Sequence, residues 1–301
     1  MAGVVKTADE VERGSAMLVI IGYVIVFAAV FGGFAMAGGH LASMLQPVEV
    51  LMIGGGALGA FIVGNSMKSL KATFAALPGC LKGSKYDKKL YMELMALLYD
   101  ILVKMRKEGL MAVESDVETP TESPLFARYP AVCKDHHLVE FMTDYLRLMV
   151  SGNMNSFEIE NLMDHEIETH HHEAEEPGHI VQKVADGLPA FGIVAAVMGV
   201  VHTMESVGIP PSELGKLIAQ ALVGTFLGIL LAYGVVGPLA SLIGERAKES
   251  TKALQCIKVT LLASLNGYAP AIAVEFGRKV LFSAERPSFA ELEMHVKQAK
   301  A

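Results

Sequence analysis

The segment that decides the fold is residues 186–204, "DGLPAFGIVAAVMGVVHTM", in which no Asp, Glu, Lys or Arg follows Asp186. A helix of this length extends about 30 Å at ~1.5 Å per residue, which matches the hydrocarbon core of a membrane. The segment nevertheless contains one proline, three glycines and one threonine. A simple anchor needs none of these residues, so their purpose has to be sought in the rest of the chain.

The composition is that of an integral membrane protein. Of the 301 residues, 52% are hydrophobic and 19% are charged, and the mean hydropathy is +0.42. Soluble domains have about 25% charged residues. The net charge of -7 supplies no basic surface, so we expect no nucleic-acid partner. Cys80, Cys133 and Cys256 lack zinc or redox spacing, and we expect reduced thiols.

Four apolar runs are long enough to cross a membrane, and they are residues 17–37, 48–67, 186–204 and 217–244. Glu49 lies at the outer margin of the second run, so we expect no carboxylate at depth in any span. The sequence predicts an all-α integral membrane protein. It has four transmembrane helices, a large helical cytoplasmic domain between helices 2 and 3, and a C-terminal cytoplasmic helix.

Lysine and arginine predict the orientation of the four spans. The connectors "GGHLASMLQ" at 38–46 and "ESVGIPPSE" at 205–213 contain neither residue, whereas six lysines follow the second run. Arg246, Lys248 and Lys252 follow the fourth run. Basic residues stay on the cytoplasmic side. We therefore expect a multi-pass protein of the inner membrane with both termini in the cytoplasm.

The chain divides into five predicted parts. Residues 1–16 form a polar cytoplasmic tail or a start-site extension, 17–69 the first two spans, 70–185 a helical cytoplasmic domain, 186–244 the last two spans, and 245–301 a C-terminal helix and tail. Within 70–185, the segments 88–109 and 136–150 repeat apolar residues at helical spacing. The segment from 156 is an acidic helix with Ser156 as its expected cap, and 117–130, with three prolines, is a loop.

Two motifs suggest chemistry that the context does not support. "GGGALG" at 54–59 matches the dinucleotide fingerprint, but it lies inside an apolar span without a preceding strand, so close helix packing is the better interpretation. His170, His171 and His172 are adjacent on a helix and point in different directions, so we expect a solvated acidic helix and no metal site. No catalytic arrangement can be named, and we expect neither an enzyme nor a cofactor.

Small side chains form a stripe in each of the last two spans. The two stripes consist of Pro189, Gly192, Ala196, Gly199 and Thr203, and of Ala221, Thr225, Gly228 and Ala232. Such stripes allow helices to approach closely, and packing within one subunit or between neighbours is the plain interpretation. A threonine hydroxyl can bond to its own helix, or it can offer an oxygen to an ion or water.

The two prolines of these spans have different expected effects. Pro189 falls in the first turn after Asp186, where its missing N–H costs little, so we expect it to start the third span. Pro238 removes a bond to the carbonyl of Gly234, and we expect a kink near the cytoplasmic end of the fourth span.

Several segments resemble the MotA family of flagellar motor stator proteins. They are "LPAFGIVAAVMGVVHTM" at 188–204, "LVGTFLGILLAYG" at 222–234, "DYLRLMVSGNMNSFEIENLMDHEIE" at 144–168 and "LNGYAPAIAVEFGRK" at 265–279. The resemblance runs from Met17 to about Phe289. It implies a stator subunit that surrounds a MotB dimer as a homo-oligomer, expected to be a pentamer. MotB supplies the ion-carrying aspartate and the peptidoglycan anchor, and the subunit pushes on the rotor protein FliG.

The resemblance also implies roles for single residues. Pro189 and Pro238 match prolines linked to ion conduction and conformational change, and Thr225 matches a hydroxyl that faces the ion site. Ala196 stands where sodium-driven relatives carry threonine, which points to H+ as the translocated ion. Arg106 and Glu114 match a charged pair that engages FliG. Without the resemblance, both would be ordinary solvated charges on a helix.

Two rival functions remain open. An energy transducer like ExbB or TolQ shares the two core spans, but it is expected to have three helices and a periplasmic N-terminus. A purely structural membrane scaffold would use the small-residue stripes for packing alone. The count of four spans favours the stator over the transducer.

Overall fold

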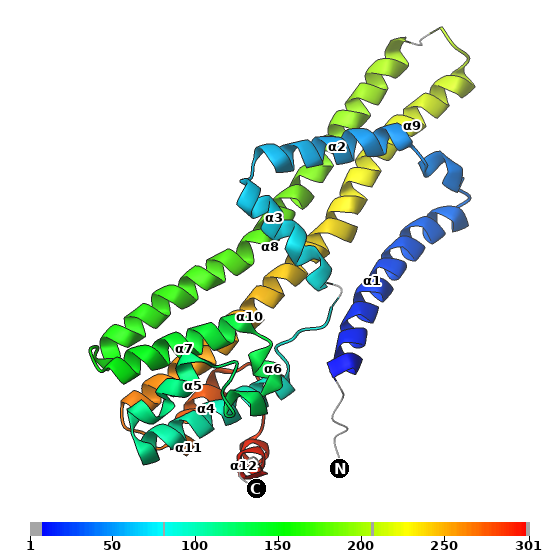
Figure 1. The fold of residues 1–301 in the computed structure, drawn as a ribbon. Coiled ribbons are helices and arrows are strands. Elements are labelled where there is room, and N and C mark those ends of the chain that lie inside the picture. The colour runs from blue at the N-terminus through cyan, green and yellow to red at the C-terminus, as the bar shows by residue number, and fades with distance from the viewer. Residues whose placement is uncertain (1–7, 81, 206–207, 299–301) are drawn as a thin grey trace. The chain divides into compact units, whose positions relative to one another are not determined.

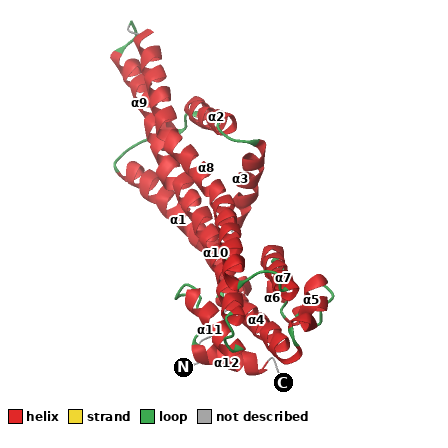
Figure 2. Cartoon of the chain, turned by 90° about the vertical axis from the view of Figure 1, so that its left-hand side faces the viewer, coloured by secondary structure: helices red, strands yellow, loops and turns green. Residues whose placement is uncertain are grey.

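Every regular element is a helix in the part of the chain that the computed structural model describes, which is residues 8–80, 82–205 and 208–298 (Figures 1 and 2). The predicted all-α class is therefore confirmed. Four helical segments are long and apolar enough to cross a membrane, as predicted: Ala16–Met36, Leu41–Val63, and parts of Ser156–Glu205 and Pro211–Leu265. Of the expected N-terminal tail, residues 1–7 lie outside the described residues.

Internal contacts divide the chain into two units, each built from two separate stretches of sequence. The first unit comprises Met1–Gly83 and Ala174–Arg246, and the second comprises Ser84–Glu173 and Ala247–Ala301. The predicted boundaries at 70 and 185 concern the membrane surface, which a division by contacts does not test, so they stay a prediction.

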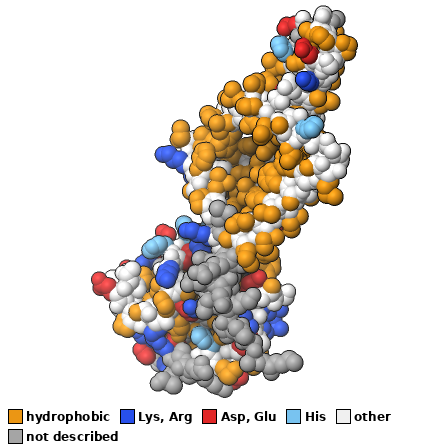
Figure 3. Space-filling model, turned by 90° about the vertical axis from the view of Figure 1, so that its right-hand side faces the viewer, with side chains coloured by type: hydrophobic (Ala, Val, Ile, Leu, Met, Phe, Trp, Pro, Cys, Tyr) orange, Lys and Arg blue, Asp and Glu red, His pale blue; other side chains and the backbone are white. Residues whose placement is uncertain are grey.

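The first unit contains the four candidate spans. Its complete elements are α1 (Ala8–Met36), η1 (Leu41–Met44), α2 (Pro47–Val63), α3 (Met67–Cys80), α9 (Pro211–Ile229) and η4 (Leu230–Val236), a π-helical segment. It also holds the later part of α8 (Ser156–Glu205) and the first part of α10 (Gly237–Leu265). Hydrophobic side chains cover most of the face of this unit that Figure 3 shows. Because large apolar side chains such as Leu18, Val63 and Leu222 are exposed, this surface suits lipid or partner helices.

The second unit is a helical domain with its own apolar core. Its complete elements are α4 (Lys88–Glu108), η2 (Leu110–Val113), α5 (Glu114–Glu118), η3 (Phe126–Arg128), α6 (Pro130–Cys133), α7 (His136–Ser151), α11 (Pro270–Val280) and α12 (Phe289–Gln298). The Asp87 carboxylate caps α4 by accepting a 2.8 Å hydrogen bond from the Leu90 N–H. Leu94, Leu97 and Leu98 on α4 are fully buried in the core, together with Tyr145 on α7.

Two details of α8 correct the sequence analysis. The helix is 50 residues long and contains Pro177 and Pro189 in its interior, so the helix that holds the third span does not begin near Asp186. The cap is Asn155 and not Ser156. The Asn155 Oδ1 accepts from the Glu158 N–H at 3.0 Å, and the Glu158 carboxylate accepts from the Asn155 N–H at 2.9 Å. This reciprocal pair is a capping box, which fixes the helix start one residue earlier.

The C-terminal helix also differs from expectation. The fourth span and the helix that was expected after Gly244 are one continuous helical stretch, in which α10 runs from Gly237 to Leu265. No helix breaker separates the apolar part from the amphipathic part, since the next left-handed glycine is Gly267 at φ 85°.

Candidate functional site

The helices α8 and α9 cross at glycines, and they run side by side in Figure 1. A Cβ atom placed on Gly192 would lie 2.8 Å from the carbonyl oxygen of Gly224 and 3.2 Å from the Cα of Gly228. A Cβ atom on Gly228 would lie 2.7 Å from the carbonyl oxygen of Leu188. Side chains therefore cannot be accommodated at this crossing, and the two backbones are in direct contact.

The small-residue stripes continue this contact toward the end of α8. A Cβ atom on Gly199 would lie 2.7 Å from that of Ala221. Ala195 is fully buried, and the Thr203 hydroxyl donates a 2.8 Å hydrogen bond to the Gly199 carbonyl of its own helix. These residues pack the two stripes against each other within one chain, which is the plain interpretation of the sequence pattern.

Ala196 and Thr225 are the stripe residues that stay partly accessible. Both are half-buried in the single chain. The Cα of Thr225 lies 3.4 Å from a Cβ atom placed on Gly192, so Thr225 belongs to the crossing itself. Its hydroxyl makes no hydrogen bond to the described residues, in contrast to that of Thr203. Thr225 therefore has an oxygen available for an ion, a water molecule or a partner helix.

Pro189 does not start a helix, contrary to the sequence expectation. It lies inside α8, half-buried, where its ring removes the hydrogen bond to the carbonyl of Ala185. The loss is tolerated because the neighbouring Leu188 is buried in an apolar cluster with Ile53 and Ala195, so packing holds this segment in place. Pro189 thus lies less than one turn from Gly192 at the crossing.

The helix is irregular directly before Pro238, where we expected a kink. The segment η4, Leu230–Val236, is π-helical and ends directly before Gly237 and Pro238. The Gly237 N–H donates to the carbonyl of Ala232, five residues earlier. A π-helical turn is one of the identified causes of a bend in a long helix. The fourth span therefore contains an irregular helical segment that follows the crossing with α8 in the chain.

Arg106 and Glu114 lie in the second unit and are exposed. Neither makes an ion pair with the described residues, whereas nearby Lys104 binds Asp116 at 2.7 Å. Arg106 lines a cavity of about 190 Å³ with Leu110, Tyr268 and others. Glu114 lines a different cavity, of about 150 Å³. Both charges are thus presented at the surface near hollows, which suits recognition of another protein.

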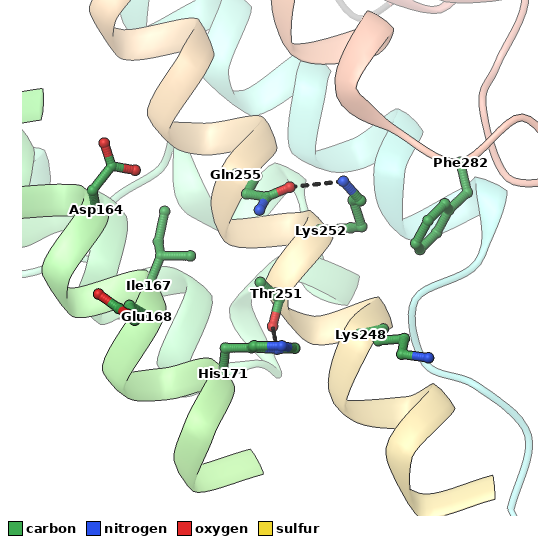
Figure 4. Close-up of a pocket in the computed structure, with 9 residues that line it drawn as sticks. All are labelled: Asp164, Ile167, Glu168, His171, Lys248, Thr251, Lys252, Gln255 and Phe282. Carbon is green, nitrogen blue, oxygen red and sulfur yellow. Dashed lines mark hydrogen bonds between the residues drawn. The ribbon is translucent and has the colours of Figure 1, made fainter. Parts of the chain in front are cut away.

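A larger cavity of the second unit lies where His171 faces α10. It measures about 490 Å³ and is lined by residues of α8 and α10 and by Phe282 (Figure 4). The His171 Nδ1 is 3.0 Å from the Thr251 hydroxyl, and the His170 Nε2 is 3.1 Å from that of Ser250. Burial, followed by the charge of His137, lowers the pKa of His170. Among the described residues, no three His, Cys, Asp or Glu side chains could hold a metal ion.

Sequence reasoning missed Glu49. This residue is 7% exposed and lies in the first turn of α2, so its burial in the protein is what the sequence analysis did not predict, whereas the expectation of no carboxylate at membrane depth stays a prediction. The pattern contained a signal for it: Glu49, Ile53, Ala57 and Phe61 are the buried residues of α2 and recur every four positions on one face.

The comparisons with known proteins agree on one family. A family model described as Motility protein A N-terminal matches residues 20–109, and one described as the MotA/TolQ/ExbB proton channel family matches residues 134–256. Motility protein A of Salmonella typhimurium is 56% identical over 284 residues, which cover 94% of this chain and 96% of that protein. The chain belongs to the MotA family.

Solved structures agree with the fold of this MotA family member. A structure described as C. jejuni MotAB has a TM-score of 0.72 and covers 90% of this chain at 18% identity, with 98% of that chain matched. A flagellar MotAB stator complex from Bacillus subtilis has a TM-score of 0.69 at 22% identity and covers 91% of this chain and 98% of that one. With its four apolar helices, this family member is a multi-pass protein of the inner membrane.

Proposed function

We propose that the chain is the stator subunit of a flagellar motor and that, together with MotB, it conducts protons and turns their flow into torque on FliG. The observation that carries this function is the 56% identity to Motility protein A along 94% of the chain. The C. jejuni and B. subtilis structures that share the fold are described as MotAB complexes, which supports MotB as the partner. The subunit acts as an ion-driven transducer and not as an enzyme.

The surface of the first unit fits an assembly with other membrane helices. Val197 on α8 and Leu222 on α9 are 56% and 62% exposed in the single chain, beside the crossing. Apolar surfaces of this extent contact lipid or protein in the membrane. In the proposed complex, a pentamer of this subunit surrounds a MotB dimer, and the aspartate of MotB carries the ion.

Ion choice and orientation follow from the sequence. Alanine at position 196 favours protons, because sodium-driven relatives of the MotA family carry threonine there, and Thr225 offers its hydroxyl to the ion site. The distribution of lysine and arginine supports a cytoplasmic position for both termini. One charge that crosses about 100 mV releases about 2.3 kcal/mol, whereas a complete switch between two states needs about 5.5 kcal/mol. Torque is therefore produced in repeated small steps.

The rotor contact is assigned to the second unit. Arg106 and Glu114 are exposed, and neither is paired with a described residue, so both charges are available to groups of opposite sign on FliG. Such pairs steer association and set its register more than they add affinity.

Complementation of a strain that lacks its own motA gene tests the proposal. We expect the chain, expressed with its MotB, to restore swimming in cells that already have intact flagella. Swimming should collapse with a protonophore and persist when potassium replaces sodium. Flagellated cells that remain immotile although both proteins reach the membrane would contradict the stator function. Rescue of an ExbB or TolQ deletion would instead support the energy transducer.

A further inference from the structure

Glu49 is a buried acid in a membrane-spanning segment. It lies in the first turn of α2, two residues after Pro47, and shares the buried face of that helix with Ile53 and Ala57. Those two residues belong to an apolar cluster with Leu188 of α8 and others. Only 7% of Glu49 is exposed, so its carboxylate points toward the packed helices and away from the surroundings of the unit.

The carboxylate lies directly against the crossing of α8 and α9. A Cβ atom on Gly224 would lie 2.5 Å from the Glu49 Oε2, 3.1 Å from the Ala195 Cβ and 3.3 Å from the Gly192 carbonyl oxygen. Gly224 therefore leaves the space that the carboxylate occupies, and any larger residue would displace it. Thr225, whose hydroxyl is assigned to the ion site, is the next residue in the chain.

The Glu49 Oε2 is buried and has no hydrogen-bond partner among the described residues. No lysine, arginine or histidine among the described residues forms an ion pair with the Glu49 carboxylate. A buried carboxylate without a partner is costly, and an ionisable group in a membrane segment marks an ion pathway. It needs a hydrogen-bond donor, a metal cation or a proton.

A proton is the occupant that the surroundings favour. Metal cations such as Ca²⁺ and Mg²⁺ need about six oxygen ligands. Among the described residues, no group of three or more His, Cys, Asp or Glu side chains could supply them. Besides Glu49 itself, the atoms nearest to a Cβ atom placed on Gly224 come from Ala195 and Gly192, which offer no side-chain donor. A single proton neutralises the charge and needs no further ligand.

We propose that Glu49 is a proton-binding site of the ion pathway, at which the carboxylate takes a proton from water on the outer side and releases it toward the aspartate of MotB. The inference rests on the proposed function. Uptake converts the carboxylate to a carboxylic acid, release restores the carboxylate, and no other bond changes. The connector 38–46, which carries no lysine or arginine, leads directly into this turn and thus places Glu49 near the periplasmic water.

The first test compares Glu49→Gln with wild type in the complete complex with MotB, reconstituted in liposomes and expressed in motA-deficient cells. The amide keeps the shape of the side chain, but it does not gain and lose a proton as a carboxyl group does. Since a positioned proton acceptor contributes about 100-fold or more, we expect proton flux to fall at least tenfold, with loss of swimming. Glu213→Gln is the matched control, because Glu213 is an exposed acid in the first turn of α9.

Glu49→Asp adds a readout that a packing role would not change. It keeps a titratable group but shortens the side chain, so we expect partial flux with an altered dependence on external pH. Glu49→Gln complexes with wild-type flux would overturn the inference while leaving the stator function intact. Wild-type chain that fails to restore swimming would instead contradict the proposed function.

A second measurement needs no variant that could fail to assemble. Dicyclohexylcarbodiimide reacts with protonated carboxyl groups in apolar surroundings, and mass spectrometry locates the modified residue. In the wild-type complex, we expect labelling at Glu49 that increases as the external pH falls, with no comparable labelling at Glu213. Absence of labelling at Glu49 over the whole pH range would overturn the inference.

Discussion

A single methyl group at Gly192 should separate α8 from α9. In Gly192→Ala, the new Cβ atom would lie 2.8 Å from the Gly224 carbonyl oxygen and 3.2 Å from the Gly228 Cα, both below ordinary contact. These neighbours are backbone atoms, so they cannot rotate away as a side chain would. Overpacking costs about 1 to 3 kcal/mol. Because the neighbours are backbone atoms, we expect a cost in the upper part of this range, about 2 to 3 kcal/mol; alanine regains about 1 kcal/mol of helix propensity, which leaves a net loss of about 1 to 2 kcal/mol.

Thermal unfolding in detergent, followed by loss of helical circular dichroism, measures this effect. At about 2 to 4 °C per kcal/mol, we expect the unfolding midpoint to fall by about 2 to 8 °C. Gly215→Ala in α9 is the control, because a Cβ atom there meets nothing within 4 Å, so its midpoint should be unchanged or slightly higher. Equal midpoints for Gly192→Ala and Gly215→Ala would refute the backbone contact at the crossing.

Further predictions concern ion passage, the rotor contact and pH. Ala196→Leu and Thr225→Leu should abolish swimming in assembled complexes, whereas Thr225→Ser should keep much of it; full motility of both leucine variants would exclude these positions from the pathway. Arg106→Glu or Glu114→Lys should lower motor torque at unchanged membrane levels, and loss of the protein itself would show a folding role. Burial lowers the pKa of His170, so the folded state binds this proton more weakly than the unfolded state. Stability should therefore fall as pH drops through the ordinary histidine range near about 6.5, and less so in His170→Gln.

Hydropathy and charge predicted the membrane architecture because both depend on composition over some twenty residues. Apolar runs without charge were sufficient to predict the four spans, and helical periodicity was sufficient to predict the acidic and amphipathic helices. An irregularity near Pro238 was also predictable, because a missing N–H inside a helix is a local property, whereas the kink itself stays a prediction. In the structure, a π-helical segment lies directly before Gly237 and Pro238.

Local rules failed where packing between distant segments decides the outcome. Pro189 looked like a helix start, but α8 continues through it and through Pro177. At Gly178, a Cβ atom would lie 3.2 Å from the carbonyl oxygen of Ala240, so close packing on α10 holds this part of α8. The position of the Glu49 carboxylate depends on the missing side chain at Gly224. Gly224 is 175 residues away in the chain, so no analysis of a short sequence segment could predict this contact.

The crossing of α8 and α9 links the proposed proton site to helix packing. A Cβ atom on Gly224 would lie 2.5 Å from the Glu49 Oε2 and 3.3 Å from the Gly192 carbonyl oxygen, so Gly224 is next to both groups. Gain or loss of a proton at Glu49 therefore changes a full charge at the crossing of the two helices. One proton supplies about 2.3 kcal/mol per 100 mV, which is similar to the cost of one misfitting methyl group at this crossing. A larger difference in packing free energy between two arrangements of the helices would exceed that supply, so the small side chains of both stripes favour movement driven by single protons.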